Sequence, residues 1–251
     1  MLKKFIKKIL NFFGIEVRLK PKFGKILNFD DIYKSKFKEK NPIIFDVGAN
    51  RGQSIERFIQ INKDLKVHAF EPNPDEYETL IKKFSSNADI YLNNFGISEN
   101  QESMNLNVTI NSGNSSFYNI KKNTDWIKIR SKQFKTNQDD FIKKIVKVKC
   151  DTLDNYCHNN KIEQIDLLKI DTQGFEDKVL SGASNLIQNK KIKFIELEIM
   201  LDEVYEKTMS FHDIETKLQN KYRLYGIDYQ GFKNLSEGYM FAVDVLYVKK
   251  N

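Results

Sequence analysis

The sequence is poor in the residues that build disulfide frameworks and zinc sites. Its 251 residues include 2 cysteines, 4 prolines, 3 histidines and 1 tryptophan. Cys150 and Cys157 are too few for a disulfide scaffold or a cysteine-based zinc site, so a reducing, cytoplasmic location is expected. No apolar run approaches the roughly 20 residues that a membrane-spanning helix requires. With 40% hydrophobic and 30% charged residues, the composition is typical of a soluble globular domain.

Excess positive charge is also absent from most of the chain. Residues 1–40 hold 12 basic and 4 acidic side chains, whereas the rest of the chain holds 29 basic and 30 acidic ones. An enzyme that acts on nucleic acid needs basic side chains around its substrate groove. The neutral body of the chain therefore argues against DNA or RNA as a substrate or partner.

The basic segment begins with MLKKFIKKILNFFG (residues 1–14), which has the pattern of an amphipathic helix. Two interpretations are equally supported. The helix lies on an anionic membrane surface, at the inner face of the membrane, or it packs its apolar stripe on its own domain or on a second subunit of a homo-oligomer. We therefore expect a basic segment over residues 1–40 and a single domain over residues 41–251.

From about residue 41, apolar strand-like runs alternate with helix-like segments. Strands are expected at 41–48, 66–72, 88–98, 165–174 and 191–200, helices at 53–62, 74–86, 175–183 and 210–220, and a closing strand pair at 222–228 and 240–250. Repeated strand–helix–strand units imply an α/β fold with a mainly parallel sheet and helices on both faces. In such sheets, ligands bind at the carboxyl ends of the strands, where the strand order reverses.

Residues 100–149 interrupt this alternation. Strand-like runs at 104–110 and 144–150 flank a polar segment, 111–140, which is expected to be an irregular insertion. The segment contains Trp126, with Phe117 and Tyr118 nearby. These aromatic residues either contact an acceptor substrate or pack the insertion on the domain, and packing is the favoured interpretation.

The turn after the first strand, in IIFDVGANRGQ (residues 43–53), contains glycines but lacks a dinucleotide fingerprint. That fingerprint needs G-x-G-x-x-G, and here Asn50 and Gln53 stand where the second and third glycines belong. At the end of the second strand, the Glu71 carboxylate can accept hydrogen bonds from both hydroxyls of a ribose. The two features together predict a nucleoside ligand without a diphosphate, and S-adenosylmethionine is the commonest cosubstrate of that kind.

Six segments resemble the FkbM family of class I S-adenosylmethionine-dependent methyltransferases. They are IIFDVGANRGQ, HAFEPNP, NSGNSSF, VKCDTLDNY, IDLLKIDTQGFEDKVLSGA and DVLYVKK, in the family's order over about residues 41–250. The resemblance implies a Rossmann-like, mostly parallel seven-stranded sheet with an antiparallel final strand, and methyl transfer to a hydroxyl oxygen. It also implies cosubstrate contacts at Asp46, Gly48, Asn50, Gly52, Glu71, Asn94 and Phe95. Members commonly carry Asp-Val-Glu-Gly after the fourth strand, whereas this chain has Asp-Thr-Gln-Gly at residues 171–174.

Charged side chains near the ends of the fourth and fifth predicted strands are the candidates for catalysis. A sugar-type hydroxyl is a poor nucleophile, so a general base or a metal ion is expected to help remove its proton. Asp171 and Glu198, with His212, can form such a base or a magnesium site, and Asp171 is the best single candidate. Lys169 lies on the same strand face as Asp171 and is either catalytic or paired with a carboxylate. His212 has the alternative of a solvated position at a helix start.

The chemical class of the methyl acceptor is inferred from the basic leader and not from a motif. The basic leader suggests an acceptor near a membrane, which favours a sugar hydroxyl of a bacterial surface polysaccharide or its precursor over a natural-product hydroxyl. A glycosyltransferase would also suit a nucleoside-binding sheet, but no D-x-D metal motif occurs. A nucleoside-binding protein without catalysis stays open as well, because Gln173 departs from the family pattern.

Overall fold

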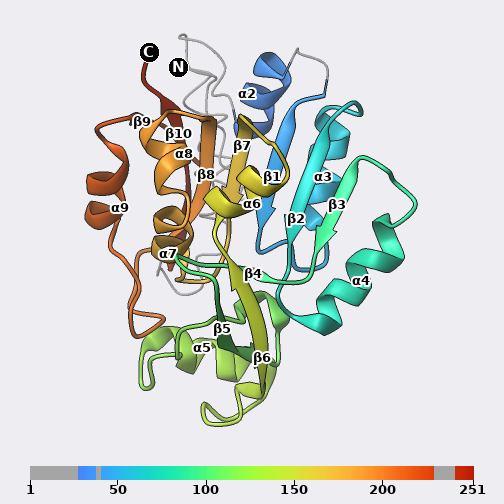
Figure 1. The fold of residues 1–251 in the computed structure, drawn as a ribbon. Helices are drawn as coiled ribbons and strands as arrows, with labels where there is room; N and C mark the ends of the chain where they lie inside the picture. The colour runs from blue at the N-terminus through green and yellow to red at the C-terminus, as the bar shows by residue number, and fades with distance from the viewer. Residues whose placement is uncertain (1–27, 38–40, 229–240) are drawn as a thin grey trace, which may run out of the picture.

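The computed structural model describes residues 28–37, 41–228 and 241–251 (Figure 1). The helices are α2 (Phe29–Lys36), α3 (Gln53–Ile61), α4 (Pro74–Phe84), η1 (Ser112–Asn114), α5 (Asp125–Phe134), α6 (Leu153–Asn159), α7 (Glu176–Ser181), α8 (Ser184–Gln188) and α9 (Phe211–Leu218). The strands are β1 (Ile43–Val47), β2 (Lys66–Phe70), β3 (Ile90–Asn93), β4 (Gly96–Ile97), β5 (Glu102–Thr109), β6 (Ile142–Asp151), β7 (Ile165–Ile170), β8 (Ile192–Met200), β9 (Tyr222–Asp228) and β10 (Ala242–Lys249).

The larger sheet has seven strands in the order β3-β2-β1-β7-β8-β10-β9. β3, β2, β1, β7 and β8 are parallel, and β10 runs antiparallel to both β8 and β9. This confirms the predicted class I methyltransferase sheet with an antiparallel final strand. The strand order reverses between β1 and β7, so a ligand is expected over the carboxyl ends of these two strands.

Helices cover both faces of this sheet (Figure 1). On one face, α2, α3 and α4 pack on strand residues such as Ile44 and Leu167. On the other, helices α6 to α9 pack on residues such as Leu168 and Leu197. The central strands are apolar along almost their whole length because they are buried on both sides.

The prediction of one continuous strand at 88–98 is wrong. The chain leaves the larger sheet after β3 and forms β4 in a second sheet of order β4-β6-β5. At the break, the Asn94 side-chain amide donates to the backbone carbonyl of Glu71 at 2.9 Å. This bond satisfies a strand-end carbonyl and holds the break beside the end of β2.

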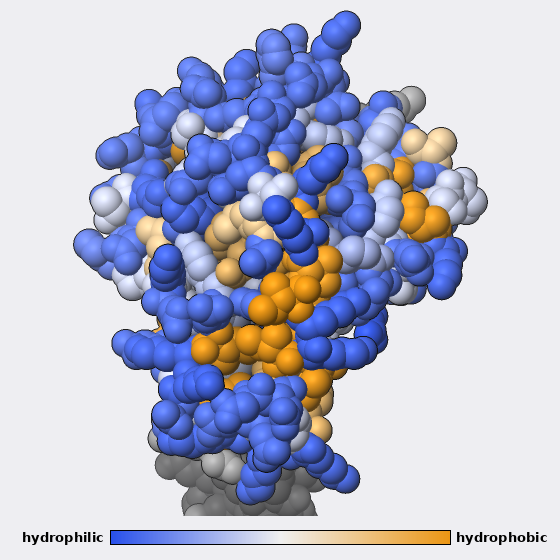
Figure 2. All heavy atoms as spheres, turned by 60° about the horizontal axis from the view of Figure 1, so that its bottom comes forward, coloured by the Kyte–Doolittle hydropathy of each residue, from blue (hydrophilic) through white to orange (hydrophobic). Residues whose placement is uncertain are grey.

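The prediction of an irregular insertion is also wrong for part of residues 111–140, which form η1 and α5. Thr124 caps α5 by accepting from the Ile127 backbone N–H. Trp126 is 3% exposed and packs against Phe141 and Tyr205, so it belongs to the core and does not reach an acceptor. Figure 2 looks onto the end of the molecule that carries this insertion, where an apolar band crosses a largely hydrophilic surface.

Residues 1–27, including the predicted amphipathic helix at 1–14, lie outside the described residues. The described part of the 1–40 segment contains α2, which packs on the α3 face of the sheet with Phe29, Ile32 and Tyr33 buried. Among the helices that the structure describes, none combines the length and the apolar character needed to cross a bilayer.

Candidate active site

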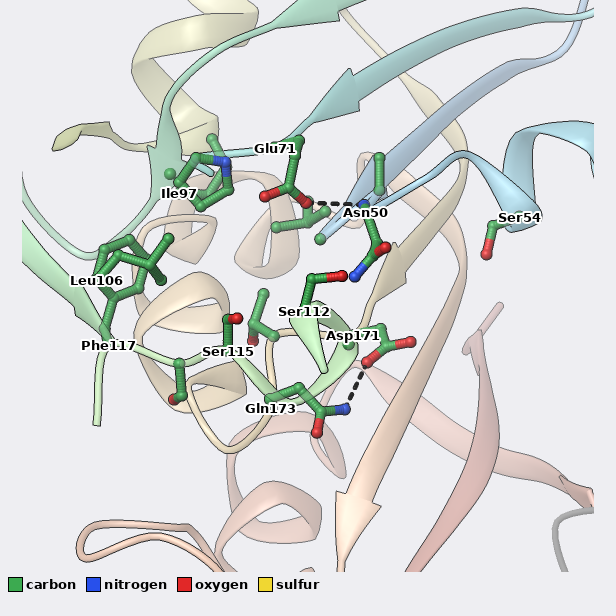
Figure 3. Close-up of a pocket in the computed structure, with 18 of the residues that line it drawn as sticks. Asn50, Ser54, Glu71, Ile97, Leu106, Ser112, Ser115, Phe117, Asp171 and Gln173 are labelled. Carbon is green, nitrogen blue, oxygen red and sulfur yellow. Dashed lines mark hydrogen bonds between the residues drawn. The ribbon is translucent and has the colours of Figure 1, made fainter. Parts of the chain in front are cut away.

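A cavity of about 280 Å³ lies at the carboxyl ends of β1, β2 and β7 (Figure 3). This is close to the lower end of the roughly 300–1,000 Å³ typical of small-molecule sites. One wall comes from the strand ends and the other from the insertion. The lining residues are Val47, Gly48, Ala49, Asn50, Gln53, Ser54, Glu71, Pro72, Gly96, Ile97, Leu106, Ser112, Gly113, Ser115, Ser116, Phe117, Lys169, Asp171, Thr172 and Gln173.

The turn after β1 depends on two glycines, and only the first lines the cavity. Gly48 has φ +86°, and a Cβ there would lie 2.0 Å from the Asp171 carbonyl oxygen. Only glycine therefore lets this turn approach the end of β7. Gly52 is the N-cap of α3 with φ +85° and packs against the Phe84 ring; it does not line the cavity, and its cosubstrate contact stays a prediction.

Glu71, the residue predicted to bind a ribose, follows the end of β2 and lines the cavity. Its carboxylate accepts the backbone N–H of Asn50 at 2.7 Å and that of Asn73 at 2.8 Å. Burial raises the pKa of Glu71 to about 7, although both backbone hydrogen bonds act to lower it. Each carboxylate oxygen has a second lone pair, so two hydroxyl donors can still bind.

Asp46 and Lys169 form a buried pair beneath the cavity. Asp46 is fully buried, and neither of its carboxylate oxygens has a hydrogen-bond partner among the described residues. Lys169 Nζ lies 3.6 Å from Asp46 Oδ1 and 3.3 Å from Asp171 Oδ2. Burial acts to lower the pKa of Lys169, but Asp171 and Asp46 outweigh it and hold that pKa above its ordinary value. The structure therefore supports an ion-paired Lys169, and Asp46 lies outside the cavity lining.

Asp171 lies at the rim of the cavity together with Gln173. The Gln173 side-chain nitrogen donates to Asp171 Oδ1 at 3.0 Å (Figure 3). The same nitrogen donates to Glu198 Oε2 at 2.7 Å. Glu198 lies behind Gln173 and does not line the cavity. Burial, with Asp171 and Asp244 adding to it, raises the pKa of Glu198 well above its ordinary value. Asp171 and Glu198, both predicted for catalysis, are therefore neighbours with the Gln173 amide between them.

The two residues predicted for the adenine side, Asn94 and Phe95, lie next to the cavity wall in the chain but outside the cavity lining. Neither Asn94 nor Phe95 lines the cavity, because Asn94 bonds to backbone and Phe95 packs its ring on Phe70 with centroids 5.6 Å apart. Gly96 and Ile97, the next two residues, form the wall instead. The adenine-side contacts of Asn94 and Phe95 stay a prediction.

His212 does not join the site. It is exposed on the first turn of α9 and is absent from the cavity lining, which corrects its placement beside Asp171 and Glu198. The insertion supplies wall residues that were not predicted individually, although they belong to the NSGNSSF segment of the family resemblance: Ser112, Gly113, Ser115, Ser116 and Phe117. Ser112 faces Asn50 across the cavity (Figure 3).

The donor set does not fit the predicted magnesium site. Among the described residues, no group of three or more metal-ligating side chains is found. The position between the Asp171 and Glu198 carboxylates faces the NH₂ group of Gln173, which donates hydrogen bonds and cannot bind a cation. No step of the reaction is therefore assigned to a metal.

The model of the Methyltransferase FkbM domain family matches residues 46–226 of the chain. The chain belongs to the FkbM methyltransferase family. The matched range contains the turn after β1, Glu71, the insertion and the turn after β7, so the whole described cavity lies within the family's domain. This FkbM-family chain is an S-adenosylmethionine-dependent methyltransferase.

Two kinds of relative are similar to it. The 2-O-methyltransferase NoeI of Sinorhizobium fredii (strain NBRC 101917 / NGR234) is 24% identical over 172 residues, which cover 68% of this chain and 69% of NoeI. Among solved structures, an rRNA methylase from Streptococcus thermophilus is similar at 10% identity and a TM-score of 0.49, covering 92% of this chain and 100% of that one. Aeropyrum pernix fibrillarin with natively bound S-adenosyl-L-methionine has 12% identity and a TM-score of 0.41, covering 84% and 67%. Similarity at these levels says nothing about the substrate of this chain.

Proposed function

We propose that this FkbM-family enzyme transfers a methyl group to a hydroxyl oxygen, and that the hydroxyl belongs to a sugar of a bacterial surface polysaccharide or its precursor. The observation that carries O-methylation is the Asp171 carboxylate, half-buried at the rim of the cavity and held by Lys169 and Gln173. The similarity to NoeI, a 2-O-methyltransferase, supports the same chemistry.

The cavity residues divide into a binding set and a reacting set. Bound S-adenosylmethionine supplies an electrophilic methyl group on a sulfonium. Glu71 accepts hydrogen bonds from a ribose, and Gly48 leaves room for a ligand to lie along the strand ends. Asp171 orients the acceptor hydroxyl and takes its proton. Alignment of this kind contributes roughly 7–11 kcal/mol to lowering a barrier.

The cosubstrate assignment is tested by calorimetry with S-adenosylmethionine and, separately, with a nucleotide sugar. We expect the first to bind and the second not to bind. Glu71→Gln keeps the size of the side chain but removes its charge, so it should weaken S-adenosylmethionine binding. Binding of the nucleotide sugar alone would favour a glycosyltransferase instead.

The role of Asp171 is tested by turnover of Asp171→Asn, which keeps the shape of the side chain without a basic oxygen pair. Loss of a general base typically costs about 10²–10⁴-fold in rate. S-adenosylmethionine binding should be nearly unchanged, since Asp171 is not assigned to the ribose. Full turnover by this variant with an identified acceptor would remove Asp171 from the mechanism.

The acceptor class is tested with labelled cosubstrate and extracted capsule or lipopolysaccharide precursors. Label in the glycan fraction supports a sugar hydroxyl, and label only in a small-molecule extract supports the natural-product alternative.

We further propose a cytoplasmic enzyme that contacts the membrane through residues 1–14. Deleting these residues should then reduce binding to anionic liposomes, whereas unchanged binding with a dimer lost would favour their packing in a homo-oligomer.

A further inference from the structure

The side-chain amide of Gln173 has four hydrogen-bond partners that divide into two pairs. Its nitrogen donates to Asp171 Oδ1 at 3.0 Å and Glu198 Oε2 at 2.7 Å. Its oxygen accepts from the Tyr205 hydroxyl at 3.2 Å and from the Asn114 side-chain nitrogen at 3.4 Å. Turning the amide over would set its oxygen against two carboxylates and its nitrogen against two donors. The partners therefore select one orientation of the amide.

The backbone conformation around Gln173 is also fixed by hydrogen bonds. Gln173 has φ +55°, in the left-handed region, and Gly174 follows with φ +93°. The Glu176 carboxylate accepts the backbone N–H groups of Thr172 at 3.0 Å and Gly174 at 3.1 Å, which fixes the turn on both sides of Gln173. A residue kept at a positive φ by its surroundings is a feature that functional sites often show.

Charge around the two carboxylates is unbalanced. Lys169 forms ion pairs with both Asp171 and Asp46. Within the described residues, Glu198 has no ion-pair partner, and Asp244 lies opposite it on β10. Two carboxylates that converge on one atom usually hold a proton or a cation between them. Here they converge on the NH₂ group of Gln173.

We propose that Gln173 is a positioning residue whose NH₂ group takes the place of a divalent cation between Asp171 and Glu198, so that the site holds Asp171 in position without a metal. The proposal rests on the proposed function in taking Asp171 as the proton acceptor. Two N–H donors on one nitrogen hold both carboxylates at fixed distances, as a bridging cation would, but they bring no full charge. The same amide ties Asn114 of the insertion to the end of β7, so the cavity wall and the reacting group share one anchor.

The proposal predicts that a single added carboxylate creates a cation site. In Gln173→Glu, three carboxylates would converge where the amide now lies, and hard cations prefer such oxygen ligands. We expect the full-length wild-type chain to show no Mn²⁺ binding by calorimetry up to millimolar concentration. Gln173→Glu should bind Mn²⁺ at least tenfold more tightly than the wild type, and Gln173→Glu with Glu198→Gln should lose that gain. Gln60→Glu, which adds the same charge on an exposed position of α3, should behave as the wild type.

Two results would overturn the proposal. One is Mn²⁺ binding by the wild-type chain that Asp171→Asn abolishes, because the site would then hold a metal beside the amide. The other is a folded Gln173→Glu variant, checked by circular dichroism, that binds Mn²⁺ no better than the wild type. The first result does not depend on Gln173→Glu, so it decides the question even if that variant does not fold. S-adenosylmethionine titrated into the same samples tests the proposed function separately, since its binding does not depend on Mn²⁺.

Discussion

Glu196 and Glu198 lie two residues apart on the same face of β8, but their surroundings differ. Glu196 is 3% exposed and accepts both Arg57 guanidinium nitrogens, at 3.0 and 2.6 Å, and the Tyr33 hydroxyl at 2.5 Å. Glu198 accepts only the Gln173 amide among the hydrogen bonds found in the described residues. The Glu196 carboxylate has a cation and a hydroxyl as partners, whereas the Glu198 carboxylate is held by a neutral donor beside a cavity.

The difference separates a structural carboxylate from one in a functional setting. Burial acts to raise the pKa of Glu196, but the charge and hydrogen bonds of Arg57, with that of Tyr33, hold the pKa below its ordinary value. Burial raises the pKa of Glu198, and no cation opposes it strongly. The first arrangement ties α2 and α3 to the sheet. The second leaves a perturbed acid next to Asp171, which is the pattern expected of an active site.

The largest effect should follow from breaking the Glu196 cluster. Arg57→Leu leaves the buried Glu196 carboxylate without its cation, and loss of one partner of a buried pair typically costs about 3–5 kcal/mol of unfolding free energy. Urea unfolding measures this as a lower midpoint with an unchanged slope. As a control, Lys83→Met removes an exposed pair with Glu56 and should cost at most about 1 kcal/mol. If Arg57→Leu and Lys83→Met lost equal unfolding free energy, the Glu196 ion pair would contribute no more to stability than the exposed Glu56 pair.

A smaller effect concerns a third buried carboxylate, Glu71, which is held by backbone N–H groups instead of a cation. Its pKa of about 7 means that its ionised fraction falls as the pH drops through neutrality. If the ionised form binds the ribose, the Kd for S-adenosylmethionine should rise by up to roughly tenfold per pH unit below about pH 7. Calorimetry at several pH values measures this change. Glu71→Gln should bind weakly with no such dependence, and a wild-type Kd that stays constant down to about pH 6 would contradict the assignment.

The sequence predicted the elements that local patterns determine. Apolar runs identified the strands of the larger sheet, and the turn after β1 and Glu71, both predicted to bind the cosubstrate, do line one cavity. The reacting side depends on contacts between distant residues, such as Asn114 with Gln173 across 59 positions. The structural Glu196 cluster does so too, since Tyr33 and Glu196 are 163 positions apart. Periodicity over a few residues cannot register such contacts. For the same reason, it could not show that Glu196 is paired and Glu198 is not.

The smallest change in stability, and the one with the opposite sign, is expected for Glu198→Gln. The raised pKa of Glu198 means that its contribution to stability is present below the pKa of the unfolded chain and is lost as the pH rises through the folded-state pKa. Removing the charge should therefore leave stability within about 1 kcal/mol of the wild type at about pH 5 and raise it relative to the wild type at about pH 8.

Glu196→Gln is the matched comparison, because it makes the same substitution two residues away. The pKa of Glu196 is lowered in the folded chain, so its contribution is present above the unfolded pKa and is lost as the pH falls through the folded one. This variant should therefore be less stable than the wild type at about pH 8 and recover relative to it in acid. Urea unfolding of both variants at the two pH values gives the comparison. If Glu198→Gln lost as much stability at the higher pH as Glu196→Gln, Glu198 would be a paired structural carboxylate like its neighbour, and the distinction between the two sites would fail.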